Sequence, residues 1–209
     1  MKRPLLLVGG GGHCKSVIEA IDGLGYNILG ILDLPKFFGK NICGYSVIGT
    51  DEDIEKYVGQ VDFLITLGFI KDASVRVRLY NLIKEIGGKM ATIVAKSALL
   101  SKNAKVGEGT VLLHNSFVNS DSQIGENVII NDFACIEHDV VVGSHTHIST
   151  GAILNGNCSV GARCFVGSRA VVVNGVNICD EVIIGAGGVV VNDITERGVY
   201  VGNPIKKLK

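Results

Sequence analysis

The chain has 209 residues, 47% of them hydrophobic, with 20 basic (Lys plus Arg) and 20 acidic (Asp plus Glu) residues. This length and composition predict one or two domains with an adequate core, and a net charge of zero argues against nucleic acid or an anionic membrane as the main partner. The sequence shows neither a signal-peptide pattern nor an apolar run of about 18 residues, so we expect a cytoplasmic protein without membrane insertion. Its cysteines form no C-x-x-C pair and are expected to be reduced thiols without metal or disulfide roles.

Strands and helices alternate through the first part of the chain. Expected strands cover residues 4–8, 27–32 and 63–67, and expected helices cover residues 14–24, 51–58 and 73–86. Residues 90–94 then run on into a region of different periodicity. This alternation is typical of a small parallel-sheet α/β domain, and we assign a Rossmann-like domain to residues 1–93.

Four glycines, Gly9 to Gly12, separate the first expected strand from the first expected helix. Such a run leaves backbone N–H groups free at the positive end of a helix dipole, which suits a phosphate. Asp33 ends the second strand, where a Rossmann acid meets a ribose hydroxyl. The dinucleotide fingerprint is incomplete, because Cys14 occupies its last glycine position and a second mononucleotide-binding half is missing. The pattern favours a mononucleotide or nucleotide sugar, and the alternative is that the glycines serve only a tight turn.

A six-residue repeat runs from Val94 to Val190, with an aliphatic residue at every sixth position and a small residue four positions after each. Residues two apart on a strand share a face, so both registers point inward from short strands. The first of three corner residues is often Gly or Asn, as at Gly107 and Asn119, and we expect positive φ there. The repeat predicts a parallel β-helix over residues 94–192, followed by a capping tail over residues 193–209.

Two sets of residues resemble a known family. Val106-Gly107, Ile124-Gly125, Val142-Gly143 and Ile184-Gly185 resemble the hexapeptide repeats of left-handed β-helix acyltransferases. Gly10-Gly11-Gly12-His13-Cys14-Lys15, followed by Ile31-Leu32-Asp33, resembles the N-terminal domain of bacterial acetyltransferases that modify UDP-linked 4-amino-6-deoxy sugars, and of related sialic acid O-acetyltransferases.

This resemblance implies a left-handed coil, acetyl-CoA as cosubstrate, no metal, and a nucleotide-sugar substrate. The residues expected to bind that substrate are Gly10, Gly11, Gly12, His13, Asp33, Gly68 and Asn131. Family members usually carry a second acid after the residue matched by Asp33, where this chain has Leu34. The identity of the nucleotide therefore stays open.

His138 and Asp139 are the second and third residues of a β-helix corner, a place that does not need histidine for packing. Attack of an amine on a thioester needs a base, and histidine titrates near pH 6.5. A nearby carboxylate can hold its tautomer. The match at Ile136-Glu137-His138-Asp139 implies that His138 is the general base and Asp139 its partner, with Glu137 as the alternative orienting acid.

The remaining polar candidates each have two interpretations. His147 points outward from a strand, so it is either a solvated residue or, by the resemblance, lies against the acetyl-CoA thioester. Asn131 serves either a corner conformation or the site, and His13 contacts the substrate or caps the first helix. His114 and His145 are expected to be surface residues. By the resemblance, acetyl-CoA is expected to pass Gly156 and Ala186, and the candidates for its phosphates are Arg163, Arg169, Arg197, Lys206 and Lys207.

The sequence therefore predicts transfer of acetyl to the amino group of a nucleotide-linked amino-deoxysugar in a ternary complex. O-acetylation of a sugar is the alternative, and a non-catalytic sugar-nucleotide-binding trimer is less favoured. Zinc chemistry on a β-helix would need histidines whole coils apart, and none are so spaced. His138 and Asn131 are expected on different corners of a triangular coil whose sides span about 16–20 Å, and His147 on the face opposite the His138 corner, so that direct contact among them within one chain is out of reach. A common site then requires neighbouring chains, which predicts a homotrimer.

Overall fold

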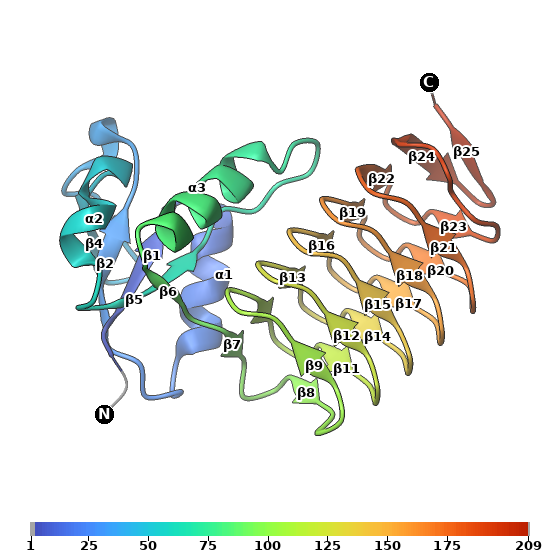
Figure 1. Ribbon diagram of the computed structural model, residues 1–209, viewed down its shortest axis with the longest axis horizontal. Coiled ribbons are helices and arrows are strands. Elements are labelled where there is room, and N and C mark those ends of the chain that lie inside the picture. Colours follow the sequence, from blue (N-terminus) through green and yellow to red (C-terminus); the bar gives the residue numbers. More distant parts are fainter. Residues whose placement is uncertain (1–2, 209) are drawn as a thin grey trace.

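The computed structural model describes residues 3–208 and contains an α/β domain followed by a β-helix (Figure 1). The two parts lie one after the other along the long axis, and the C-terminal strands lie at the end far from the α/β domain (Figure 1). Both parts of the predicted fold class are confirmed. Within residues 3–208, the helices are all too short or too polar to cross a membrane.

The α/β domain is built on a six-stranded sheet of order β3-β4-β2-β1-β5-β6, in which only β3 runs antiparallel to its neighbour. Alternate residues of β1 face opposite sides. Leu5 and Leu7 pack in a core with α1, whereas Leu6 and Val8 pack with α2 and α3. The elements are β1 (Leu5–Val8), α1 (Gly12–Ile21), β2 (Ile28–Leu32), η1 (Pro35–Phe37), β3 (Asn41–Ile42), β4 (Tyr45–Gly49), η2 (Asp51–Asp53), α2 (Ile54–Tyr57), β5 (Asp62–Ile65), α3 (Ser74–Glu85) and β6 (Lys89–Met90).

The hairpin of β3 and β4 was not expected from the sequence. Cys43 and Gly44 form its turn, with φ of 47° and 90°, and the side chain of Asn41 accepts a hydrogen bond from the Gly44 N–H. Positive φ at both central residues is the geometry of a type I′ turn. Cys-Gly is not one of the usual dipeptides for this turn, so the residues carry no clear hairpin signal.

Three parallel sheets form the β-helix, and each strand pairs with the strand one coil, or 18 residues, away, as in Val111 with Ile129. We name the sheets by their outer surfaces. The covered sheet contains β7 (Ile93–Val94), β10 (Val111–Leu112), β13 (Ile129–Ile130), β16 (His147–Ile148), β19 (Phe165–Val166), β22 (Val182–Ile184), β24 (Gly198–Gly202) and β25 (Ile205–Lys207). The apolar sheet contains β8 (Leu99–Leu100), β11 (Phe117–Val118), β14 (Cys135–Ile136), β17 (Ile153–Leu154), β20 (Val171–Val172) and β23 (Val189–Val190). The polar sheet contains β9 (Lys105–Val106), β12 (Gln123–Ile124), β15 (Val141–Val142), β18 (Ser159–Val160) and β21 (Asn177–Ile178).

The interior of the coil is filled by the two predicted registers. Ile136, Leu154 and Val172 of the aliphatic register are fully buried, and so are Ala134 and Ala152 of the small register. Each coil contributes such residues to one continuous core. Stacking of coils is therefore what buries the apolar surface of each one.

The prediction of positive φ at the first corner position was wrong. Positive φ falls on the third position, as at Asp121, Asp139 and Asn157. Glycine at the first position has another cause: a Cβ on Gly143 would lie 2.5 Å from the Ala162 backbone nitrogen of the next coil. Close stacking of coils excludes a side chain there, and the third residue makes the turn in the left-handed region.

The outward residues distinguish the three sheets. On the covered sheet, Val111 and Ile129 are fully buried and share a core with residues of α1. On the apolar sheet, Leu99 is 57% exposed and Ile153 is 36% exposed. On the polar sheet, Lys105 and other outward residues are mostly hydrophilic and exposed. The α/β domain thus shields one face of the coil and leaves an apolar face open.

The tail continues the covered sheet beyond the last complete coil. Ile194 forms a bridge with Ile178, β24 pairs in parallel with β22, and β25 turns back antiparallel to β24. Tyr200 and Ile205 pack against the end of the coil core. The tail therefore covers apolar residues that the last coil would expose.

Candidate functional site

The glycine loop ends β1 and leads directly into α1, which begins at Gly12. Gly9 has φ of 103°, and Gly10 donates its N–H to Asp33 Oδ2 at 3.0 Å. Gly11 and Gly12 are exposed, and no atom lies within 4 Å of where a Cβ would stand on either. Exposed backbone at the helix start, on Gly11 and Gly12, can bind an anion.

Asp33 braces the loop as well as facing it. Its second oxygen, Oδ1, accepts the Leu34 N–H at 2.7 Å. Both carboxylate oxygens thus accept hydrogen bonds from backbone N–H groups, and the side chain links the end of β2 to the glycine loop. Contact of Asp33 with a ribose hydroxyl stays a prediction, since each oxygen retains a further lone pair.

A cavity of about 660 Å³ lies where the glycine loop, the segment after β5 and the covered sheet meet. Its lining includes Gly11, His13, Gly68, Asn131 and His147. The structure thus brings together most residues that the sequence assigned to the substrate, together with one assigned to acetyl-CoA. Gly68 packs closely on His13, because a Cβ at this position would lie 3.3 Å from that of His13, a tight contact.

His147 is only 7% exposed, because the α/β domain covers it. Its Nδ1 lies 2.9 Å from the Phe69 carbonyl oxygen, which can only accept, so Nδ1 carries the hydrogen. Burial lowers the pKa of His147 to about 4, the hydrogen bond to Phe69 opposes this shift, and the charge of Arg76 adds to it. The ring is neutral at neutral pH, and its Nε2 is an acceptor.

Asn131 completes this hydrogen-bonded chain. Its Oδ1 accepts the Asp132 N–H at 2.8 Å, which fixes the orientation of the amide. Its Nδ2 donates to His147 Nε2 over 3.4 Å, a long hydrogen bond. The expectation that Asn131 and His147 could meet only across chains was therefore wrong, because the corner residue reaches the outward strand residue of the next coil within one chain. The second hydrogen of Nδ2 has no partner within residues 3–208, so Asn131 can donate it to a ligand in the cavity.

His13 lies at the start of α1, with its ring centroid 6.1 Å from that of His147. Burial lowers its pKa to about 3, and Arg76 and His147 contribute to the shift. Its buried Nε2 meets no hydrogen-bonding partner in the described part of the chain. A ligand in the cavity is the natural partner for this atom, because buried polar groups are rarely left unpaired.

His138 lies elsewhere, on the corner between the apolar and polar sheets. Its side chain is 58% exposed, and Nδ1 lies 2.8 Å from Asp139 Oδ2. Glu137, the alternative partner, is engaged with Asn119 Nδ2 at 2.8 Å. The structure therefore pairs His138 with Asp139 and leaves Nε2 open to solvent.

Gly156 lies beneath the imidazole of His138. A Cβ at this position would lie 2.6 Å from both Cε1 and Nε2 of the ring. The sequence offered Gly156 as space for acetyl-CoA, and here the same space holds the catalytic candidate. Ala186 is exposed on the same edge of the coil as Asn131, three coils further on.

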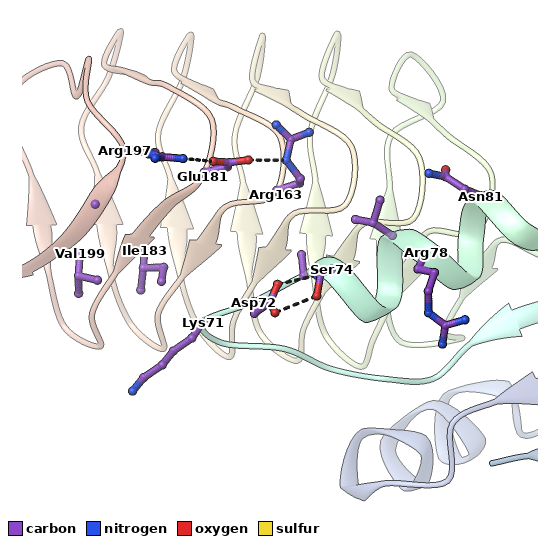
Figure 2. Close-up of a pocket in the computed structure, with 13 residues that line it drawn as sticks. Lys71, Asp72, Ser74, Arg78, Asn81, Arg163, Glu181, Ile183, Arg197 and Val199 are labelled. Atoms are coloured by element: carbon purple, nitrogen blue, oxygen red, sulfur yellow. Dashed lines mark hydrogen bonds and ion pairs between the residues drawn. The ribbon is translucent and has the colours of Figure 1, made fainter. Parts of the chain in front are cut away.

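A second cavity, of about 760 Å³, lies between the start of α3 and the far part of the covered sheet (Figure 2). Arg163 and Arg197 both bind Glu181 along one wall (Figure 2). Lys207 in turn pairs with Glu196. Of the candidates for the CoA phosphates, only Arg169 and Lys206 form no ion pair within residues 3–208 and remain available.

His145 and Arg76 take positions that the sequence did not predict. His145, which was expected to be a surface residue, is half-buried: its ring packs on Tyr80 of α3 at 5.2 Å, and Nδ1 lies 3.0 Å from Asn127 Nδ2. Burial lowers its pKa. Arg76 of α3 is 1% exposed and contacts both domains. Neither position could be inferred without knowing where α3 docks.

Within residues 3–208, no three His, Cys, Asp or Glu side chains are grouped as a metal site. All six cysteines are free thiols. The polar groups that line the first cavity include two neutral imidazoles, one side-chain amide and backbone N–H groups. These groups can bind and orient a phosphorylated, hydroxyl-rich ligand.

Comparisons with known proteins identify related domains in both parts of the chain. Residues 4–83 match the PglD N-terminal domain, and residues 121–156 match the bacterial transferase hexapeptide model of six repeats. A search of curated proteins found no significant match.

Solved structures extend the match over the whole chain. The acetyltransferase domain of PglB from Neisseria gonorrhoeae is 30% identical with a TM-score of 0.92, covering 99% of this chain and 100% of that one. The same domain in complex with acetyl coenzyme A is 29% identical with a TM-score of 0.91, covering 100% of each chain. PerB from Caulobacter crescentus, in complex with CoA and GDP-perosamine, is 31% identical with a TM-score of 0.92, covering 99% and 97%. The resemblance inferred from the sequence is confirmed, and the chain belongs to the family of bacterial acetyl-CoA-dependent sugar N-acetyltransferases that join a PglD N-terminal domain to a left-handed hexapeptide β-helix.

Proposed function

We propose that this enzyme acetylates the amino group of a nucleotide-linked amino-deoxysugar, with His138 as general base. The observation that carries the assignment is the His138–Asp139 pair on an exposed corner. A carboxylate accepts from Nδ1–H, which leaves Nε2 as the atom that accepts a proton. Its position on a solvent-accessible edge makes that atom reachable by a substrate.

The reaction follows from these positions. The substrate amine attacks the thioester carbonyl, a C–N bond forms and the C–S bond breaks. The amine proton passes to Nε2 of His138, while Asp139 stabilises the imidazolium. The proton then leaves on the sulfur of CoA. No cysteine is needed as a nucleophile, and burial raises the pKa of Cys158 and Cys164 to about 11 and about 12.

In this proposal the first cavity holds the sugar nucleotide. Gly11 and Gly12 bind phosphate with their N–H groups, and His13 Nε2 meets a polar group of the ligand. Asn131 donates its free amide hydrogen to the substrate or to the acetyl carbonyl. His147 cannot donate from Nε2, so its contact with the thioester region is as an acceptor and as the support of Asn131.

We further propose that three chains assemble along the coil axis. Asn131 and His138 stand on different corners of the triangular coil, separated by a side of about 16–20 Å. The apolar sheet between these corners is exposed, with Leu99 and Ile153 at 57% and 36% exposure, and Phe133 on the adjoining corner is 62% exposed. A closed ring of three would cover this surface and bring His138 of one chain to the cavity of the next. A cytoplasmic location is part of the proposal and accords with six unpaired thiols.

The reaction is tested by incubating the protein with acetyl-CoA and UDP-, GDP-, CMP- and dTDP-linked sugars, each as the amino sugar and as its hydroxyl analogue. Release of free thiol with one amino sugar, and none with its hydroxyl analogue, is the expected result. Release with the hydroxyl analogue alone would assign O-acetylation. Binding of nucleotide sugars without thiol release from any of them would indicate a non-catalytic module.

The assembly is tested by subunit mixing. His138→Ala and Asn131→Ala proteins, each inactive alone, are dissociated, mixed and reassembled. Random mixing gives about a quarter of the interfaces both native residues, so part of the activity should return. A fully active monomer would exclude the shared site. As the control, each variant is dissociated and reassembled on its own, and it should stay inactive.

A further inference from the structure

Arg76 lies at the junction of the two domains and is the largest fully buried side chain of the protein, at 1% exposure. Within residues 3–208 no carboxylate forms an ion pair with it. Burying a cation without a counter-charge costs free energy, and an apolar residue of similar size would serve packing alone. The arginine therefore calls for a reason beyond packing.

Its hydrogen bonds join the two domains. Nη1 donates to the carbonyl oxygens of Ile65 and Leu67 at 2.7 and 2.9 Å, and Nε donates to that of Asn127 at 3.3 Å. Ile65 is the last residue of β5, and Leu67 belongs to the segment after β5 that forms a wall of the first cavity. Asn127 is a corner residue of the β-helix. One planar guanidinium thus sets the position of this segment against the coil.

The segment then fixes the polar groups of the cavity. Two residues after Leu67, the Phe69 carbonyl accepts from His147 Nδ1, and His147 Nε2 accepts from Asn131. A shift of the segment would remove the acceptor that selects the Nδ1–H tautomer of His147. Nε2 could then carry the hydrogen and could no longer accept from Asn131.

The charge of Arg76 acts on the same groups. The charged and titratable groups that bear on His13 are Arg76 and His147, and Arg76 bears on His147. Burial lowers the pKa of Arg76 only to about 9, so it is charged at neutral pH. A cation nearby disfavours the charged imidazolium of both histidines, and this helps to keep both rings neutral.

We propose that Arg76 is a positioning residue for acetyl transfer, which acts through Phe69 and His147 to aim the free amide hydrogen of Asn131 into the cavity. The inference deepens the proposed function and rests on it. It assigns to the domain junction a role in catalysis that does not involve contact with substrate.

The test compares Arg76→Met, Arg76→Lys and the control Arg78→Met. Arg78 lies two residues along the same helix, is exposed and pairs with Asp51. Thermal unfolding establishes that each variant folds. Steady-state kinetics give kcat and KM, and nitrogen-15 NMR of the histidine rings gives the tautomer and pKa of His147, assigned with a His147→Gln protein.

In the native protein we expect His147 to be neutral and Nδ1-protonated at neutral pH. Arg76→Met should lower kcat/KM about 10- to 100-fold, as small misplacements do, raise the pKa of His13 and His147, and mix the His147 tautomers. Arg76→Lys keeps a charge but cannot form the fork, so it should keep the low pKa values and still lose activity. Arg78→Met should match the native protein in all three measurements.

Three results would overturn the proposal: a native His147 protonated on Nε2, unchanged tautomer and kcat/KM in Arg76→Met, or full activity in Arg76→Lys. If Arg76→Met does not fold, the activity of Arg76→Lys and the His147 tautomer in the native protein still test the proposal. The NMR measurements need no substrate. Failure of acetyl transfer itself would therefore show separately, in the substrate panel.

Discussion

Two histidines of the β-helix, His138 and His147, stand on the same repeating backbone in opposite environments. His147 is 7% exposed, and both its ring nitrogens have partners in the chain. The His138 side chain is 58% exposed, and only its Nδ1 has a partner. The difference arises because the α/β domain packs over the covered sheet and leaves the far corner bare.

This contrast separates two tasks that one site must perform. The buried group, with Asn131, His147 and His13, is neutral, and two of its members are joined by a hydrogen bond, which suits recognition of a substrate whose polar groups must be met in fixed positions. The exposed group keeps a free Nε2 that can exchange protons, which suits a general base. Under the proposed function, the buried group would bind substrate and the exposed pair would act as the base, and the two lie on different parts of the coil.

The largest expected effect on kcat comes from removing the proposed general base, His138. His138→Ala should lower kcat about 10²- to 10⁴-fold, and because the side chain is mostly exposed, the melting temperature should change little. Thiol-release kinetics and thermal unfolding measure the two effects. His114→Ala is the matched control, since His114 also lies on a corner and bonds only Ser97 through its ring. Unchanged kcat in His138→Ala would remove this residue from the mechanism.

Substitution of Asp139, the acid partner of His138, is expected to have the next largest effect on kcat. Asp139→Asn should lower kcat about 10- to 100-fold, because an amide can donate to Nδ1 and so favour the tautomer whose Nε2 cannot accept a proton. Asn tolerates the φ of 61° at this position, so the fold should be kept. Glu137→Gln, which leaves the Asp139 contact intact, should retain most of the activity. The reverse order of the two variants would transfer the orienting role to Glu137.

Gly156, which lies against the His138 ring, allows a test with a smaller expected loss of kcat. Gly156→Ala would place a methyl group 2.6 Å from Cε1 and Nε2 of the ring, so the imidazole must move. We expect a loss of about 10-fold in kcat, with little change in stability, since the ring can swing into solvent. Adding Gly156→Ala to His138→Ala should cause no further loss if the effect acts through the ring. A rise in KM for acetyl-CoA alone would instead favour the groove that the sequence suggested.

Much of the β-helix could be predicted because its registers are local. An inward aliphatic every six residues predicts a coil of short parallel strands, although its left hand was implied only by the family resemblance, and the alternating strands and helices of the α/β domain were predicted from their apolar runs. The corner conformation was not readable, since Gly107 and Asn119 suggested positive φ at the first position, whereas Asp139 and even Phe133 adopt it at the third. Stacking between coils, which the repeat alone does not describe, decides this point.

The candidate site was predicted in its residues but not in its arrangement. His138 and Asp139 are neighbours in sequence, so their pairing could be anticipated. The meeting of His13 with His147, the burial of His145 and the role of Arg76 all depend on how the two domains dock. In the sequence Ser74-Val75-Arg76-Val77-Arg78, the buried and the exposed arginine look alike. No local pattern distinguishes them.

The smallest expected effect concerns stability and separates the buried group from the rest of the protein. The pKa of His13 is about 3 and that of His147 about 4, below the ordinary value of about 6.5 in the unfolded chain. As pH falls below about 6.5, the unfolded chain binds protons that the folded chain does not, so the free energy of unfolding decreases, by at most about 1.4 kcal/mol per pH unit for each histidine. The decrease ends only below the folded pKa values, where both states are protonated.

Urea unfolding at a fixed protein concentration, at about pH 7.5 and about pH 5.5, measures this slope while most carboxylates stay ionised. His147→Gln and His13→Gln should each show a shallower slope than the native protein, because each removes one buried group that resists protonation. Equal slopes in all three proteins would mean that neither ring is held neutral by the α/β domain, and the contrast between His138 and His147 would then be one of exposure alone.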